Sequence, residues 1–162
     1  MNQATVTAQP GQSTIRISRI FDAPRDKVFT AMTTKELVAK WWVGRDYKVT
    51  VKELDARSGG TWHYIQASDA GDEFSFHGCF HLVLNDDKHS LVVQTMEFDG
   101  LPEPGHVALE KMELTDLPGG KTQMVVISAF SSVEDRDGMI QSGMEEGMNQ
   151  TYAKLDAVLQ DL

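Results

Sequence analysis

The chain has 162 residues, enough for one domain of ordinary size, with a formal net charge of −9 and 41% hydrophobic residues. This acidic balance argues against binding to nucleic acid or to an anionic membrane surface, because both partners attract basic faces. The single cysteine, Cys79, excludes an internal disulfide and any zinc site that needs two thiolates.

Residues 1–13 lack the basic start and the apolar run of a signal peptide, and we expect them to form a disordered polar tail. Residues 14–162 are then one domain, because no linker or repeat interrupts them. No stretch approaches the roughly 18 consecutive apolar residues of a membrane helix. Together with the single free cysteine, this favours a cytoplasmic location.

The first predicted element is a strand over residues 14–22, since apolar and polar side chains alternate along it. Arg19 interrupts the apolar face of this strand. We expect its charge either to neutralise Asp55 or to meet an anionic ligand. Asp55 is also expected to pair with Arg57 within its own turn. Pro24 then ends the strand, and two short helices follow.

The period changes from helical to two at Tyr47, which predicts six further strands. Consecutive strands with short turns form an antiparallel sheet. In the third of these strands the apolar side chains share one parity, and Gly78 predicts a bulge or bend. The first strand begins at Tyr47, and the others cover residues 61–67, 73–84, 90–98, 106–114 and 122–130.

Apolar residues at spacings of three and four predict one long helix from Ser131 or Ser132 to the C-terminus. It is the only element large enough to cover the apolar face of the sheet. Glycine costs about 1 kcal/mol in a helix interior, so Gly143 and Gly147 indicate either close approach of the sheet or room for a ligand. The outer face of the helix is expected to carry Glu145, Glu146, Asp156 and Asp161.

Four segments carry a family resemblance. In their order and spacing they resemble the START-like (SRPBCC) superfamily, and more closely its branch of activator of Hsp90 ATPase homologues. The resemblance extends over residues 14–160. The segments are RIFDAPRDKVFTAMTTKELVAKWW over residues 19–42, DARSGG over 55–60, EFSFHGCF over 73–80 and GMEEGMNQTYAKLDAVL over 143–159.

The resemblance implies an α+β helix-grip fold. In that fold a curved antiparallel sheet, here of about seven strands, wraps around a long C-terminal helix. Two short helices follow the first strand, and a cavity lies between sheet and helix. Several relatives bind apolar small molecules there, others are enzymes of polyketide cyclisation, and others contact the chaperone. The resemblance therefore specifies the fold more closely than the function.

The side chains expected to line the cavity are mostly apolar or aromatic. Methionine is flexible and polarisable, which suits an adaptable pocket. Adjacent residues on a helix point about 100° apart, so one of the two neighbouring tryptophans should pack inward and the other lie at the cavity mouth. On the strand over 61–67, either His63 or its neighbours Trp62 and Tyr64 face the cavity. The ligand-binding candidates are Trp41, Trp42, His63, Phe76, Met144, Met148 and Tyr152.

Signals for metal or covalent chemistry are weak. His77, Cys79 and His81 alternate with other residues, but positions i and i+4 of a strand lie about 13 Å apart, which is too far for a shared ion. The sequence contains no Ser-His-Asp ordering, phosphate loop, dinucleotide fingerprint or HExxH motif. We therefore predict no metal, no cofactor and no catalytic residue. Acids such as Glu110 and Glu113 need burial to act in catalysis, and burial is not visible in the sequence.

We expect a protein that binds an apolar or aromatic small molecule in the cavity. The first alternative is an enzyme that uses the same cavity, with His63 or Glu97 as its polar group. The second is an interaction module, in which the acidic helix face meets a chaperone or another basic partner. A homodimer, formed through a sheet edge or the tryptophan region, is a further alternative.

Overall fold

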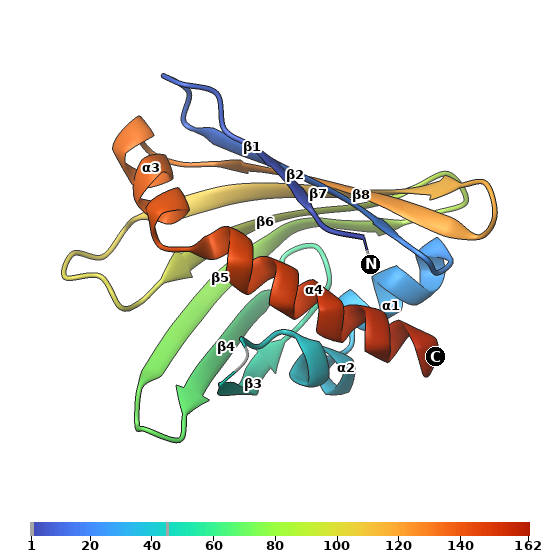
Figure 1. The fold of residues 1–162 in the computed structure, drawn as a ribbon, viewed down its shortest axis with the longest axis horizontal. Helices are drawn as coiled ribbons and strands as arrows, with labels where there is room; N and C mark the ends of the chain where they lie inside the picture. Colours follow the sequence, from blue (N-terminus) through green and yellow to red (C-terminus); the bar gives the residue numbers. More distant parts are fainter. Residues whose placement is uncertain (1, 45) are drawn as a thin grey trace.

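Eight strands form one antiparallel sheet that curves around a long helix in the computed structural model (Figure 1). The structure describes residues 2–44 and 46–162. The strands are β1 (Thr5–Thr7), β2 (Thr14–Phe21), β3 (Tyr47–Leu54), β4 (Thr61–Ser68), β5 (Glu73–Asn85), β6 (Ser90–Phe98), β7 (Val107–Leu117) and β8 (Lys121–Ala129). The helices are α1 (Arg25–Thr33), α2 (Lys35–Trp41), α3 (Val133–Gln141) and α4 (Met144–Gln160).

The order across the sheet is β1-β2-β8-β7-β6-β5-β4-β3, with α1 and α2 between β2 and β3. This arrangement confirms the α+β helix-grip fold. Side chains on the concave face of the sheet and on α4 form the core, in which Phe21, Leu114, Met124 and Leu155 are fully buried. Each large apolar side chain that is removed from water contributes about 1.5–3 kcal/mol, so this contact is the main attraction between sheet and helix.

The eighth strand lies in the segment that we expected to be a disordered tail. β1 pairs antiparallel with β2, and Val6 is opposite Ile17. Just before it, Ala4 is buried, and its amide N–H donates to Asn149 Oδ1 at 3.0 Å. The prediction of disorder over residues 1–13 is therefore wrong here. A three-residue strand has too little pattern of its own and depends on the edge that β2 offers it.

β5 contains a bulge, although not at Gly78. The pairing of β5 with β6 shifts between Phe80 and Leu82. The shift turns Leu82 to the outer face, where it is 38% exposed, and turns Val83 toward the core. At Gly78 a side chain would overlap the carbonyl oxygen of Thr95, so this glycine permits close packing of the two strands instead.

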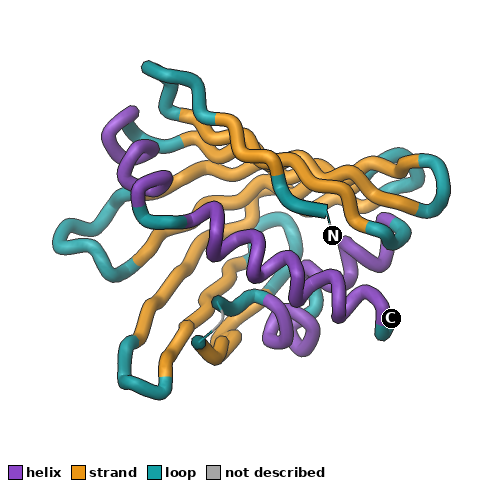
Figure 2. The backbone as a smooth tube through the Cα atoms, viewed as in Figure 1, coloured by secondary structure: helices purple, strands orange, loops and turns teal. Residues whose placement is uncertain are grey.

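The predicted C-terminal helix is divided into α3 and α4 (Figure 2). Ser132 caps α3 as predicted, because its side chain accepts a hydrogen bond from the amide of Asp135. Gly143 has a φ of 81° and ends the helical path, a conformation that glycine adopts without steric cost. Gly147 lies inside α4. No helix among residues 2–44 and 46–162 is both long and apolar enough to cross a membrane.

Arg19 is buried, and it pairs with Asp156 of α4. Its Nη1 and Nη2 atoms lie 2.8 and 2.5 Å from the two carboxylate oxygens. Two predictions are therefore wrong, because Arg19 does not pair with Asp55, and Asp156 does not point away from the sheet. An interior guanidinium needs a carboxylate at hydrogen-bond distance, and α4 supplies it. Asp55 pairs with Arg57 at 2.9 Å, as predicted.

Candidate functional site

A pocket of about 420 Å³ lies between the concave face of the sheet and α4. β2, the strands from β4 to β8 and all four helices line it, together with Trp42 and Gly44 just after α2. Pockets for small organic ligands typically measure about 300–1,000 Å³, so this one is within the usual range.

Methionine is concentrated around this pocket. The chain has eight methionines, and all seven that the structure describes line it. They come from six different elements, because strands β6, β7 and β8 each add one to those of the helices. Flexible thioether side chains on every side give the pocket walls that adjust to the shape of a ligand. The seven are Met32, Met96, Met112, Met124, Met139, Met144 and Met148.

The three tryptophans of the chain also line the pocket. Trp41, at the end of α2, is buried, and its Nε1–H donates to the carbonyl oxygen of Ala31 at 2.9 Å. Trp42 follows the helix and is half-buried. The two neighbours thus differ as their positions on a helix imply: Trp41 is fixed in the core, and Trp42 is free to contact a ligand.

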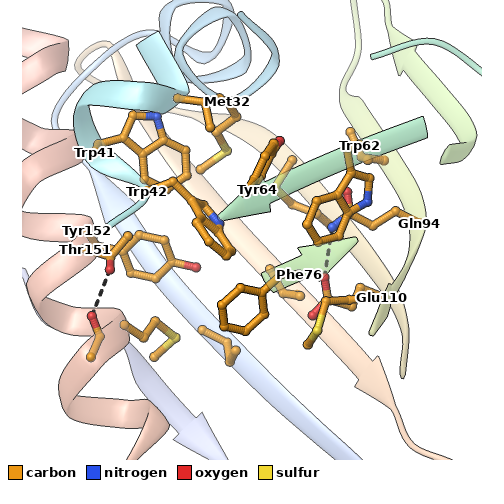
Figure 3. A pocket seen from close by; sticks show the side chains of 18 of the residues that line it. Met32, Trp41, Trp42, Trp62, Tyr64, Phe76, Gln94, Glu110, Thr151 and Tyr152 are labelled. Carbon is orange, nitrogen blue, oxygen red and sulfur yellow. Dashed lines mark hydrogen bonds between the residues drawn. The ribbon is translucent and has the colours of Figure 1, made fainter. Parts of the chain in front are cut away.

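Trp42 stands in the middle of an aromatic cluster (Figure 3). Its ring centroid lies 6.4 Å from Trp62, 4.9 Å from Tyr64 and 5.2 Å from Phe76, with the rings edge to face. Such contacts contribute about 0.5–1.5 kcal/mol each beyond the area that they bury. The cluster therefore holds one wall of the pocket in a defined shape.

The structure places six of the seven ligand-binding candidates around this pocket. The exception is His63. α4 contributes three of the six candidates, which lie on one face of the helix together with Gly147. The six are Trp41, Trp42, Phe76, Met144, Met148 and Tyr152.

His63 lies on the opposite face of the sheet, so its assignment to the pocket is wrong. Trp62 and Tyr64 are buried and line the pocket, and alternation along β4 sends the residue between them outward. His63 Nε2 lies 2.8 Å from Ser75 Oγ, which donates to Asp99 Oδ2 at 2.6 Å. Since the serine donates to the carboxylate and not to the histidine, this is not the geometry of an activated nucleophile.

Glu97 was the other group considered for catalysis, and it too lies outside the pocket. It accepts a hydrogen bond from the amide of Gly105, and it lies 3.5 Å from His77 Nε2. The other ring nitrogen of His77 contacts Asp99. Burial raises the pKa of Asp99, but the hydrogen bonds from Ser75 and His77 outweigh it, and the net pKa shift is downward. Among the described residues, no three His, Cys, Asp or Glu side chains are arranged to hold a metal ion.

The acidic group that lines the pocket is Glu110 of β7. It is the one charged side chain among the described residues that line the pocket. Gln94 of β6 and Ser128 of β8 are its cross-strand neighbours. Gln94 Nε2 donates to one carboxyl oxygen at 3.0 Å, and Ser128 Oγ donates to the other at 3.3 Å (Figure 3 shows the first of these). Both oxygens therefore already accept a hydrogen bond from a neutral side chain.

Burial is the largest influence on the pKa values of the ionisable side chains in the pocket. It raises the pKa of Glu110, and the hydrogen bonds from Gln94 and Ser128 offset only part of the rise. Burial also raises the pKa of Tyr152, and the nearby charge of Glu110 raises it further. The pKa of Tyr64 is raised by burial as well. Both phenols thus keep their protons, and Glu110 is the group in the pocket that can change charge.

Replacement of Glu110 by glutamine is expected to reduce the pH dependence of stability. Because the folded-state pKa lies above the usual value of 4.5, the native state holds a proton that the unfolded state has released. The wild-type free energy of unfolding should therefore fall relative to that of E110Q as pH rises above about 4.5. Chemical denaturation over a pH series measures this difference, and a difference that stays constant with pH would contradict it.

A second polar group in the pocket wall has no partner. Trp62 Nε1 is buried and makes no hydrogen bond with any residue that the structure describes. It lies over Gly78, its cross-strand neighbour, which has no side chain to offer. A buried donor without an acceptor costs about 1–3 kcal/mol, so this indole N–H lowers the stability of the pocket wall.

Residues 22–160 match the family described as "Activator of Hsp90 ATPase homolog 1-like protein". The chain belongs to this family. The resemblance found in the sequence motifs is thereby confirmed. No curated protein gives a significant match.

Solved bacterial structures share the fold of this chain. A protein from Rhodobacter sphaeroides has a TM-score of 0.85 at 21% identity, with 99% of each chain covered. A protein from Mycobacterium smegmatis has a TM-score of 0.80 at 19% identity, with 98% of each chain covered. One from Staphylococcus epidermidis has a TM-score of 0.77 at 24% identity, covering 98% of this chain and 95% of its own. At these identities the likeness establishes the fold alone.

Proposed function

We propose that the protein binds an apolar or aromatic small molecule in the pocket between the sheet and α4. The observation that carries this proposal is the convergence of seven methionines and an aromatic cluster, from both sheet and helices, on one pocket. Ligand pockets combine apolar walls with a few polar groups that fix orientation. Glu110 is such a group.

Tryptophan fluorescence tests the proposal directly, because all three tryptophans line the pocket. We expect N-phenyl-1-naphthylamine, a neutral apolar probe, to quench this fluorescence saturably with one probe bound per chain. The same probe should raise the melting temperature, since a ligand that binds only the native state stabilises it. The absence of both effects up to the solubility limit of the probe would contradict the proposal.

A cavity enzyme of the polyketide cyclase type is a second candidate, and Glu110 is the observation that favours it. A pocket carboxyl whose pKa is raised by burial holds its proton at higher pH than an exposed one, which suits a general acid. Mass spectrometry of a bound compound, recovered after incubation with the wild-type protein and with E110Q, distinguishes turnover from binding. Recovery of the unchanged compound in both cases favours a binding protein.

A further inference from the structure

Among residues 2–44 and 46–162, no basic side chain lines the pocket beside Glu110. Its two hydrogen-bond partners, Gln94 and Ser128, are neutral. The basic side chains that β2 and α4 direct inward are engaged elsewhere. Arg19 is paired with Asp156, and Lys154 donates to backbone carbonyl oxygens at 3.2 and 3.0 Å. The pocket thus holds a carboxyl group whose charge no side chain in the described part of the chain neutralises.

An isolated carboxylate in apolar surroundings is costly, and the cost falls when a partner of opposite charge enters. An ionised carboxyl offers about four acceptor positions. Two positions at Glu110 are occupied by the donors from Gln94 and Ser128, one on each oxygen. No other described side chain donates to Glu110, so the remaining positions can accept N–H groups from a ligand. This arrangement fits a donor cation, whereas a ligand carboxylate would be repelled.

The aromatic wall favours the same type of ligand. The negative faces of aromatic rings attract cations, by about 0.5–2 kcal/mol per contact. Rings of Trp42, Trp62, Tyr64, Phe76 and Tyr152 all line the pocket with Glu110. Methionine sulfur is polarisable and contacts the apolar body of a ligand without demanding a fixed shape.

We propose that the natural ligand is a lipophilic cation, an amine on an apolar or aromatic body, whose ammonium group pairs with Glu110. This inference rests on the proposed function and adds the chemical class of the ligand. Without a cation, burial raises the pKa of Glu110, and a bound ammonium group favours the ionised form again. Binding of the amine is therefore coupled to loss of the proton from this carboxyl.

A matched set of three compounds tests the inference: 2-(2-naphthyl)ethylamine, 2-(2-naphthyl)ethanol and 2-naphthylacetic acid. They share one aromatic body and differ in charge. Calorimetry with the wild-type protein is expected to show the amine binding at least about tenfold tighter than the alcohol, with the acid weakest. In E110Q the preference for the amine over the alcohol should be lost.

Glu113→Gln is the matched control. Glu113 lies on the same strand with opposite parity, outside the pocket, so E113Q should keep the preference for the amine. Equal affinity of amine and alcohol for the wild-type protein, or an amine preference that survives in E110Q, would overturn the inference. Binding of the alcohol in those cases would still support the proposed function. Failure of all three compounds and of N-phenyl-1-naphthylamine would overturn both.

Discussion

Replacement of Gly147 by leucine is expected to weaken the binding of N-phenyl-1-naphthylamine by at least about tenfold. Gly147 lines the pocket from α4, and no atom lies within 4 Å of the position that a Cβ would occupy. A leucine side chain therefore extends into the space that the ligand would fill. The variant should fold well, because leucine is favoured over glycine in a helix interior by about 0.5–1 kcal/mol.

Gly138→Leu is the control for this variant. Gly138 is also helical and also has open space around its Cβ position, but it is exposed on α3 and does not line the pocket. It should gain similar helix stability and keep wild-type affinity. Fluorescence titration and thermal unfolding measure both quantities. Wild-type affinity in a folded Gly147→Leu variant would place the ligand elsewhere.

Gly143 and Gly147 show which features of the C-terminal helices could not be predicted from the sequence. Gly143 and Gly147 both fall on the apolar stripe of the predicted helix. Only Gly143 adopts a positive φ and separates α3 from α4, while Gly147 stays helical. Glycine permits both conformations, and the packing of α4 against the sheet decides between them. The existence of the long C-terminal helix was predictable, but the position of its break was not.

Some of the pocket residues could likewise be predicted from the sequence, and others could not. Alternation along β4 predicted that His63 and Trp62 face opposite sides, and only the folded sheet shows which side is the pocket. The larger apolar area of the tryptophan was the signal that favours its burial. Glu110 was missed as a pocket residue because its surroundings depend on three strands. Its partners Gln94 and Ser128 are brought beside it by the register of β6, β7 and β8, which no single strand encodes.

Loss of the Asp156 carboxylate is expected to lower the free energy of unfolding by about 3 kcal/mol, measured as Asp156→Ala by chemical denaturation. The side chain of Arg19 is 1% exposed and that of Asp156 is 30% exposed. The variant would leave the guanidinium buried, in contact with the carbonyl oxygen of Asn2 and with the rings of Phe21 and Tyr152. Water can reach the vacated position in part, which keeps the loss at the lower end of the range for broken interior ion pairs.

Two further variants distinguish the contribution of the Arg19–Asp156 ion pair from that of the apolar contacts between α4 and the sheet. Asp161→Ala removes an exposed carboxylate at the end of the same helix and should change stability by less than about 0.5 kcal/mol. The double variant Arg19→Met with Asp156→Leu removes both charges and replaces them with apolar side chains, so it should recover most of the loss. A double variant as unstable as Asp156→Ala would mean that the ion pair itself holds α4 on β2. Recovery would mean that the instability of Asp156→Ala arises from the unpaired guanidinium. α4 would then be held to the sheet by the apolar contacts that also form the pocket.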